Sequence, residues 1–418
     1  MRKQFNNSSC YSIFSAFLFA VLVLFFISCA SQQKSSTSEA ETPEAQTLIQ
    51  NADADDDSPR DTITLLFAGD IMAHSVNYNI SSYDKIWRDV KELIKKPDLA
   101  FGNIEAPVDT TQSASNYPNF NMTKKYVQAV IDAGFDVFSL ANNHTNDQSL
   151  KGINETIKTS QTLTIENAEK GHKIYFSGLK TSPESQFSYC IVERHGWKIL
   201  FLAVTEILNR PDSASHINYI KTSPEAKEAF CKYIADLKAS NPCDLFVLSI
   251  HANESEYVRT VQDSQEEFYK ALLENGVDVV WANHAHIIKN RKIIVDTKTG
   301  REKLIMYANG NTISGQRTKP ELTSKNPVSE RDNTGDGLLY QVEFKKGCDN
   351  NQSTLKILRA KPFFITTYIN TAYEYVLKPL NQDFIDYLNE VQRLNWAKYI
   401  ERRIKINKDA TKDIIEWQ

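Results

Sequence analysis

The chain lacks the features that nucleic-acid binding or a cysteine-built scaffold would require. Its 418 residues carry a formal net charge of −4 and a pI near 6.1, so it has no basic excess for contacting phosphate backbones. The six cysteines show no Cys-x-x-Cys spacing, which leaves a zinc knuckle or a dithiol redox motif unsupported. Nucleic acid is therefore not an expected partner. Cys231 and Cys243 could pair in an oxidising compartment, but free thiols are equally compatible with the sequence.

Aromatic residues are absent from 30–60, where seven acidic side chains face only Lys34 and Arg60 as basic ones. Such a segment buries too little apolar surface to offset the entropy lost on ordering. We therefore expect residues 30–60 to form a disordered acidic tether.

The amino terminus has the pattern of an export signal. Arg2 and Lys3 precede an apolar run at 11–27, and Cys29 follows at its end. This pattern resembles a bacterial lipoprotein signal, in which the cysteine is lipidated and becomes the first mature residue. We predict a signal peptide at 1–29 and a lipid-anchored protein in the cell envelope, outside the cytoplasm. The alternative is an uncleaved membrane anchor, since about 17 apolar residues just span a bilayer.

Past the tether, short apolar runs bounded by turn residues alternate with segments of helical periodicity. Two sheets with helices outside them predict an α/β sandwich over 61–345. A second, more antiparallel sheet is predicted from the runs 173–176, 187–192 and 197–204. Residues 346–418 differ in character and predict a C-terminal extension with an amphipathic helix that begins behind Asn381, a good N-cap.

Five of the predicted strands end in residues that bind metals. Ligands of open α/β sheets lie just past the carboxyl ends of the strands, so these side chains should converge. Carboxylates, amide oxygens and imidazoles suit Zn, Mn or Fe. The pattern predicts one polynuclear metal site, and its members are Asp70, Asn103 with Glu105, Asn143 with His144, His251, and His284 with His286.

Each of these residues also has a structural alternative. A Gly-Asp pair after a strand is often a turn, paired asparagines can cap a helix, and a single histidine is commonly a core residue. However, four of the eight histidines lie in these motifs, which favours a site. His144 directly follows the proposed ligand Asn143, so it would point near the metals without binding them, which suits a general acid.

The ordered motifs resemble those of the CapA family of poly-γ-glutamate capsule synthesis proteins, which is similar in fold to calcineurin-like metallophosphoesterases. The resemblance runs from Ile63 to Phe344. It rests on Gly69-Asp70, Gly102-Asn103-Ile104-Glu105, Ala141-Asn142-Asn143-His144, His251, Asn283-His284-Ala285-His286 and Gly310-Asn311.

The resemblance implies a four-layer αββα sandwich with two divalent metal ions (Mn, Zn or Fe) and with His144 as the catalytic acid. The implied metal residues are Asp70, Glu105, Asn143, His251, His284 and His286. Classical metallophosphoesterases carry a histidine where this chain has Met72, and His74 could substitute for it. Further residues expected to line the substrate pocket are Asn103, Tyr257 and Asn311.

In function, the resemblance implies capsule or envelope polymer biosynthesis by metal-assisted hydrolysis or transfer at a phosphoryl or acyl centre. The expected partner is an anionic polymer or a phosphorylated substrate. Two alternatives remain open. One is a non-catalytic module that binds polymer through its metals during assembly or export, and the other is an envelope adhesin on a lipid tether.

Overall fold

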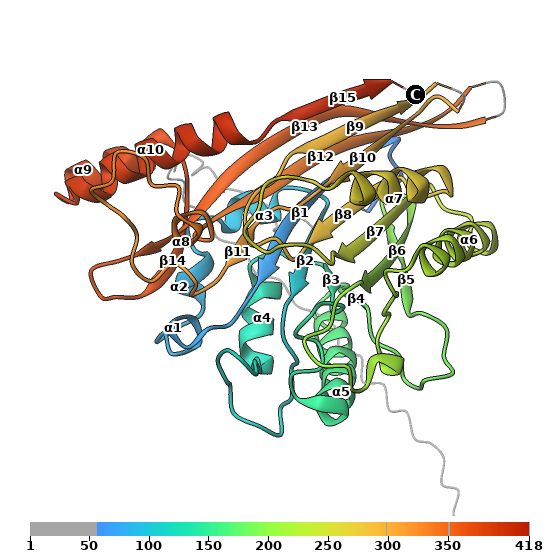
Figure 1. Ribbon diagram of the computed structural model, residues 1–418, viewed down its shortest axis with the longest axis horizontal. Helices are drawn as coiled ribbons and strands as arrows, with labels where there is room; N and C mark the ends of the chain where they lie inside the picture. The colour runs from blue at the N-terminus through green and yellow to red at the C-terminus, as the bar shows by residue number, and fades with distance from the viewer. Residues whose placement is uncertain (1–56, 298, 350–351, 418) are drawn as a thin grey trace, which may run out of the picture. The chain divides into compact units, whose positions relative to one another are not determined.

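The computed structural model describes residues 57–297, 299–349 and 352–417, and these residues form one compact unit (Figure 1). The predicted signal peptide, Cys29 and most of the predicted tether lie outside the described residues. Among the described residues, no helix has the length and apolar character needed to cross a membrane.

Two mixed β-sheets form the centre of this unit (Figure 1). The first sheet has the order β14 (Tyr375–Pro379), β13 (Gln352–Ile369), β12 (Asp336–Asp349), β1 (Thr62–Ile71), β2 (Leu99–Ile104), β3 (Val137–Ser139) and β4 (Tyr175–Ser177), and β11 (Asn311–Ile313) pairs with β1. The second sheet has the order β15 (Asp413–Trp417), β9 (Arg291–Asp296), β10 (Arg301–Met306), β8 (Val279–Asn283), β7 (Leu245–His251), β6 (Trp197–Thr205) and β5 (Tyr189–Arg194).

Along the described chain, the helices are interspersed with these strands. They are α1 (Ser75–Tyr78), α2 (Asp84–Trp87), α3 (Lys91–Lys95), α4 (Lys124–Asp132), α5 (Ser149–Ala168), α6 (Pro224–Ser240), α7 (Asp263–Glu274), α8 (Glu330–Asn333), α9 (Gln382–Glu390) and α10 (Leu394–Ala410).

Aromatic side chains join the inner faces of the two sheets. The ring of Phe101 in β2 lies 5.6 Å from that of Phe201 in β6, and Phe67 in β1 lies 6.0 Å from Trp281 in β8. These residues belong to one buried cluster between the sheets. Because strand side chains alternate in direction, Phe67 faces this cluster while its neighbour Leu66 faces the helices.

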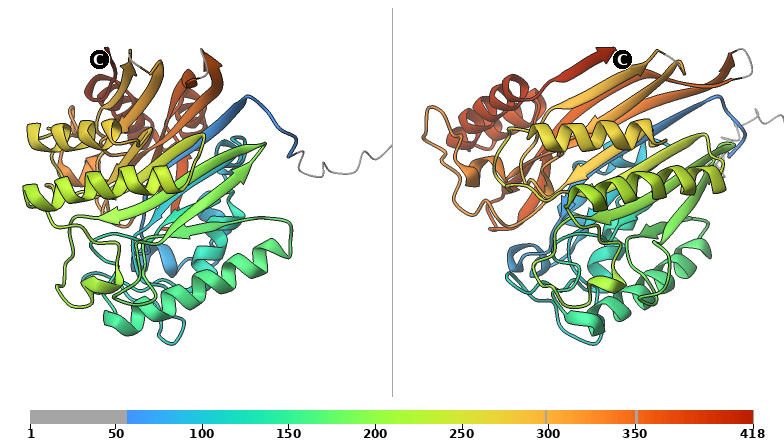
Figure 2. Two further views of the ribbon diagram at one scale, coloured as in Figure 1. Left: turned by 90° about the vertical axis from the view of Figure 1, so that its right-hand side faces the viewer. Right: turned by 45° about the vertical axis from the view of Figure 1, so that its right-hand side comes forward.

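The outer faces of both sheets are covered by helices. Leu66 packs in one buried cluster with Val130 of α4, and Leu248 packs in another with Ile234 of α6 and Phe268 of α7. Figure 2 shows α6 and α7 on one side of the unit and α4 and α5 on the other. The layers are therefore helix, sheet, sheet and helix, which confirms the predicted αββα sandwich.

One predicted strand was assigned to the wrong sheet. The run 173–176 was expected in the second sheet, but β4 pairs in parallel with β3 and completes the edge of the first. The antiparallel pairing was correctly predicted for β5 and β6, which pair along the whole of β5.

The residues after 345 contribute to both sheets. The predicted domain boundary at 345/346 falls inside β12; β13 and β14 extend the first sheet, and β15 pairs in parallel with β9 of the second. Helix α9 begins behind Asn381, whose side chain accepts the backbone N–H of Phe384 at 3.0 Å. Helices α9 and α10 pack with β13 and β14 in a fourth buried cluster.

Candidate metal centre

The site begins where β1 passes between β2 and β11. In this register Asp70 lies opposite Asn103 on one side and opposite Asn311 on the other. Asn103 donates a hydrogen bond to the Asp70 carboxylate at 2.8 Å. The close passage of β1 requires Gly69, because a Cβ there would lie 1.8 Å from the carbonyl oxygen of Gly310. Glycine at position 69 therefore allows the strand end that carries Asp70 to lie this close to Gly310.

Asp70, Glu105 and His251 form the centre of the site. One potential ligand atom from each lies within 4.8 Å of the other two, and all three residues are buried. Neither carboxylate oxygen of Glu105 has a hydrogen-bond partner among the described residues. Burial, and next the charge of Asp70, raise the pKa of Glu105 well above its usual value. A buried carboxylate without partners is costly, and a divalent cation would compensate for that cost.

The remaining predicted ligands surround this centre. His251 Nε2 lies 2.9 Å from the amide oxygen of Asn143 and 3.1 Å from Nδ1 of His284. His286 Nδ1 lies 3.2 Å from Asp70 Oδ2, and its Nε2 lies 3.9 Å from Glu105 Oε1. All six residues that the sequence predicted as metal ligands are therefore brought together in one connected, buried group.

Burial keeps two of these imidazoles in the form that binds metal. Burial lowers the pKa of His251 well below its usual value and lowers that of His284 to about 4. The charges of neighbouring histidines are the second cause in both cases. Both rings are thus neutral at pH 7, with a lone pair available for coordination. The backbone of His284 has a φ of 96°, which is rare outside glycine. The fold therefore holds His284 in a strained conformation beside the ligand atoms, and the donor set fits divalent metal ions.

His144 is held by a carboxylate that the sequence analysis did not identify. Its Nδ1 lies 2.7 Å from Oδ2 of Asp147, and that oxygen also accepts the backbone N–H of Phe120 at 2.8 Å. The side-chain amide of Asn209 lies 3.2 Å from Nδ1 and 3.4 Å from Nε2. If Nδ1 carries the proton shared with Asp147, Nε2 is the atom that can exchange a proton with a substrate.

The weaker pocket predictions also lie at this edge of the sheets. The Nδ1 of His74 accepts the backbone N–H of Gly315 at 3.0 Å, which leaves only Nε2 for a further contact. The ring of Tyr257 lies 6.3 Å from that of His286. Asn311 is buried, and its side-chain oxygen has no hydrogen-bond partner among the described residues.

Two residues of the site were missed. Asp147 follows His144 by three positions, a spacing that could have suggested their contact within one turn. Asn209 had no comparable signal, because it lies in the loop after β6 and reaches the site through tertiary structure. Its backbone N–H donates to the carbonyl oxygen of Asn143 at 3.0 Å, and this bond fixes the two loops together.

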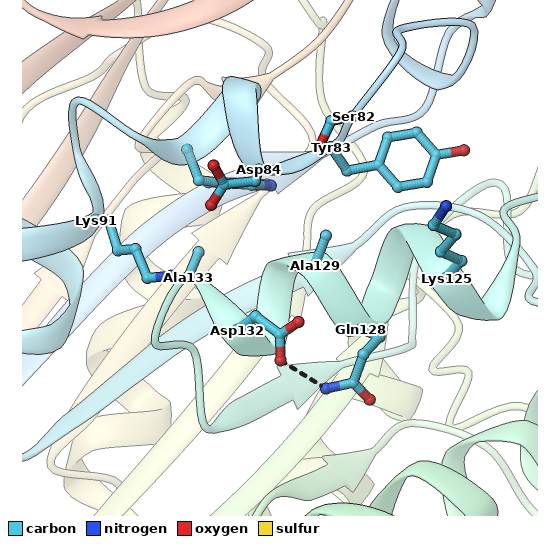
Figure 3. A pocket seen from close by; sticks show the side chains of 10 residues that line it. Ser82, Tyr83, Asp84, Lys91, Lys125, Gln128, Ala129, Asp132 and Ala133 are labelled. Atoms are coloured by element: carbon cyan, nitrogen blue, oxygen red, sulfur yellow. Dashed lines mark hydrogen bonds between the residues drawn. The ribbon is translucent and has the colours of Figure 1, made fainter.

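A separate pocket of about 410 Å³ lies between α2 and α4 (Figure 3). Its lining contains no histidine or cysteine and none of the predicted site residues, and it includes Lys91, Lys125, Gln128 and Asp132. The predicted site residues therefore lie at the strand ends and not at this pocket.

The fold and the site define an αββα protein with a candidate centre for divalent metal ions. Residues 64–316, more than half of the chain, match the family described as "Bacterial capsule synthesis protein PGA_cap". The chain belongs to that family, which confirms the resemblance seen in its ordered motifs.

Two curated relatives are similar over much of the same region. The chain is 28% identical over 269 residues to "Capsule biosynthesis protein CapA" of Bacillus anthracis, and the match covers 62% of each protein. It is 23% identical over 284 residues to "PGA biosynthesis protein CapA" of Bacillus subtilis (strain 168), with 66% of this chain and 67% of that protein covered. The match thus spans less than two thirds of the Bacillus anthracis protein.

Two solved structures are also similar to this chain. One is a hypothetical protein from Thermus thermophilus, with a TM-score of 0.40, 15% identity, and coverage of 72% of this chain and 98% of that one. The other is the calcineurin-like phosphoesterase YfkN from Bacillus subtilis, with a TM-score of 0.39, 11% identity, and coverage of 81% and 99%.

Proposed function

We propose that this chain is a lipid-anchored, metal-dependent protein of capsule or envelope polymer biosynthesis that hydrolyses or transfers at a phosphoryl or acyl centre. The observation that carries the proposal is the buried carboxylate of Glu105, beside Asp70 and His251, whose two oxygens have no hydrogen-bond partner in the part of the chain that the structure describes. Such a group is retained in a fold only if something compensates for its burial, and divalent cations do so.

In this proposal, two divalent ions (Mn, Zn or Fe) are held by the six predicted ligands. When bound, such ions polarise a phosphoryl or acyl oxygen and neutralise its developing charge. The ligands themselves are Asp70, Glu105, Asn143, His251, His284 and His286.

His144 supplies the proton. Asp147 holds the imidazole in one orientation and stabilises its protonated form, so Nε2 donates to the oxygen of the leaving group. The side-chain amide of Asn209 also contacts both nitrogens of the ring and restricts its rotation. His144 is buried, and its ring packs edge-on against Phe120 with 4.8 Å between centroids, so few other orientations are open to it.

The proposed substrate is an anionic polymer or a phosphorylated precursor of one. The names of both relatives concern capsule or PGA biosynthesis, and this supports an envelope polymer as the setting. Anionic groups are also what a centre of divalent cations attracts.

Two non-catalytic functions compete with this one. A module that binds polymer through its metals would need the six ligands but not the proton donor. A plain adhesin on a lipid tether would need neither.

His144→Ala separates these functions. An enzyme should lose about 10²–10⁴-fold in rate on phenyl phosphate, whose leaving oxygen needs a proton, while retaining its metal; a loss of that size is the usual contribution of a general acid. The matched control is His172→Ala, which removes another histidine paired with a carboxylate at 2.7 Å, that of Asp136 before β3. If His144→Ala fully restores capsule to a deficient cell, catalysis is not the function. If Asp70→Ala also restores it, the metal centre is not required either.

A further inference from the structure

A short helix beyond the family-matched residues carries an outward-facing cation near the metal centre. Helix α8 is anchored by hydrogen bonds on both sides of Arg331. The side chain of Ser329 caps the helix by accepting the N–H of Asp332, and Asn311 donates to the carbonyl oxygen of Thr334 at 2.9 Å. Because Asn311 lies opposite Asp70 in the sheet, this last bond ties α8 to the metal centre.

The C-terminal helix fixes the other side of α8. Tyr399 donates to the carboxylate of Asp332 at 2.6 Å, and Arg403 donates to the side-chain oxygen of Asn333 at 3.0 Å. Asp332, Tyr399 and Arg403 are all fully buried. The platform that carries Arg331 is therefore rigid, which is what precise placement of a binding group requires.

Arg331 differs from the other arginines around this platform. Arg259 bonds to Asn333, while Arg317 and Arg403 are both buried against Asp336. Arg331 is exposed, and its guanidinium has no hydrogen bond or ion pair within the described ranges. Its charge is thus available to a ligand.

The contacts of its neighbours place Arg331 beside the site. Arg259 donates to the side-chain oxygen of Asn333 in α8 at 3.2 Å, and the ring of Tyr257, two residues before Arg259, lies 6.3 Å from that of His286. Burial and His286 are the larger causes that lower the pKa of His74 to about 3, and the charge of Arg331 adds to them. Burial and Glu256 raise the pKa of Tyr257, and Arg331 opposes that rise. The contribution of Arg331 to both pKa shifts agrees with the placement that these contacts give.

We propose that Arg331 binds an anionic group of the substrate beside the candidate metal centre. A guanidinium offers two parallel N–H donors that match a phosphate or a carboxylate. The substrate would then carry a charged group at this position in addition to the group that reacts. This inference rests on the proposed function, because it assigns a substrate contact to the same site.

The test is calorimetric titration of the Mn²⁺-loaded full chain with inorganic phosphate and, separately, with glutarate. Arg331→Gln should weaken anion binding by about five- to tenfold, and Arg331→Lys by less, because lysine keeps the charge but loses the fork. Mn²⁺ affinity should be unchanged in both. Arg359→Gln is the matched control, since it removes an exposed arginine of β13 whose side chain is 74% accessible.

A loss with both anions, or with only one, supports the inference and in the second case identifies the group. Unchanged binding of both anions to Arg331→Gln, or an equal loss in Arg359→Gln, would overturn it. It would also be overturned if the wild type bound Mn²⁺ but neither anion. Failure of the wild type to bind Mn²⁺ at all would instead overturn the proposed function.

Discussion

Nδ1 of His144 lies 2.7 Å from Oδ2 of Asp147, and the same oxygen accepts a backbone N–H from Phe120. The backbone therefore fixes the carboxylate, and the carboxylate fixes the imidazole. This relationship gives His144 a defined tautomer, with Nε2 directed away from Asp147.

The first prediction follows from that contact. Asp147→Asn should lower the rate on phenyl phosphate, whose leaving oxygen needs a proton, by about 10²–10⁴-fold, because an amide no longer stabilises the protonated imidazole. The Mn²⁺ content should stay at the wild-type value, as measured by elemental analysis. Asp136→Asn, which alters the contact with His172 instead, serves as the control and should leave the rate unchanged. A wild-type rate for Asp147→Asn would show that His144 does not act through this pair.

The second prediction concerns Glu105 and pH. Its pKa is raised in the folded chain above the usual 4.5, so its contribution to stability is complete below about pH 4.5 and is lost as pH rises through the folded value. Glu105→Gln avoids that loss. Without metal, the variant should therefore melt above the wild type, and the difference in Tm should grow as pH rises from about 4.5 to about 7.5.

With Mn²⁺ the order should reverse, because the wild type gains stability from the ion and the variant does not. Thermal unfolding in the presence of a chelator and then of Mn²⁺ measures both effects. Glu267→Gln, on the exposed face of α7, should change neither value. A metal-free Glu105→Gln variant that melts below the wild type throughout this pH range would contradict the role given to the carboxylate.

The third prediction concerns the attachment of the C-terminal helix. Asp336 lies 2.9 Å from Arg317 and 2.7 Å from Arg403, and all three are buried. Burial alone would raise the pKa of Asp336, but Arg403 and Arg317 outweigh it and hold the pKa below its usual value. The carboxylate is thus charged at pH 7, and its removal leaves two buried guanidiniums without their partner.

Asp336→Asn should lower the free energy of unfolding at pH 7 by about 3–5 kcal/mol. Urea denaturation measures this change, and Asp409→Asn on the exposed side of α10 should have almost no effect. Because the folded pKa of Asp336 is lowered, its contribution is present above the usual value of 3.8 and is lost as pH falls below it. A variant as stable as the wild type at pH 7 would show that this network does not hold α10.

The fourth prediction concerns location. Cys29 lies outside the described residues, so the lipid anchor rests on the sequence alone. Cys29→Ser should release the protein from the membrane fraction or leave a precursor of higher mass, because the acceptor thiol is gone. Fractionation and migration like the wild type would favour an uncleaved membrane anchor.

The ligand set was predictable because it depends on local order. A buried strand is recognisable from its apolar run, and neighbouring parallel strands of one sheet bring their carboxyl ends to the same edge. This brings Asp70 and Glu105 together at the end of the first sheet, and His251 and His284 together at the end of the second. The stacking of the two sheets then joins the two groups, and that step comes from the tertiary fold and not from local order.

The parts that could not be predicted depend on contacts between distant residues. Arg403 meets Asp336 across 67 positions, and β13 pairs with β12 in a register that no local pattern determines. The run 173–176 was assigned to the wrong sheet for the same reason. Its pairing with β3 depends on tertiary structure and cannot be read from its own residues. The contacts between α10 and α8 could not be predicted either, because they join residues 67 and 70 positions apart.

The decisive measurement for the candidate metal centre is the metal content of the purified full chain. Elemental analysis should find about two divalent ions of Mn, Zn or Fe per chain, the number that such a hydrolytic centre uses. Asp70→Ala and His284→Ala should each reduce that content, because each removes a ligand. A wild-type chain with no bound metal, and no affinity for Mn²⁺, Zn²⁺ or Fe²⁺ on titration, would contradict the assignment of these strand ends as a metal centre.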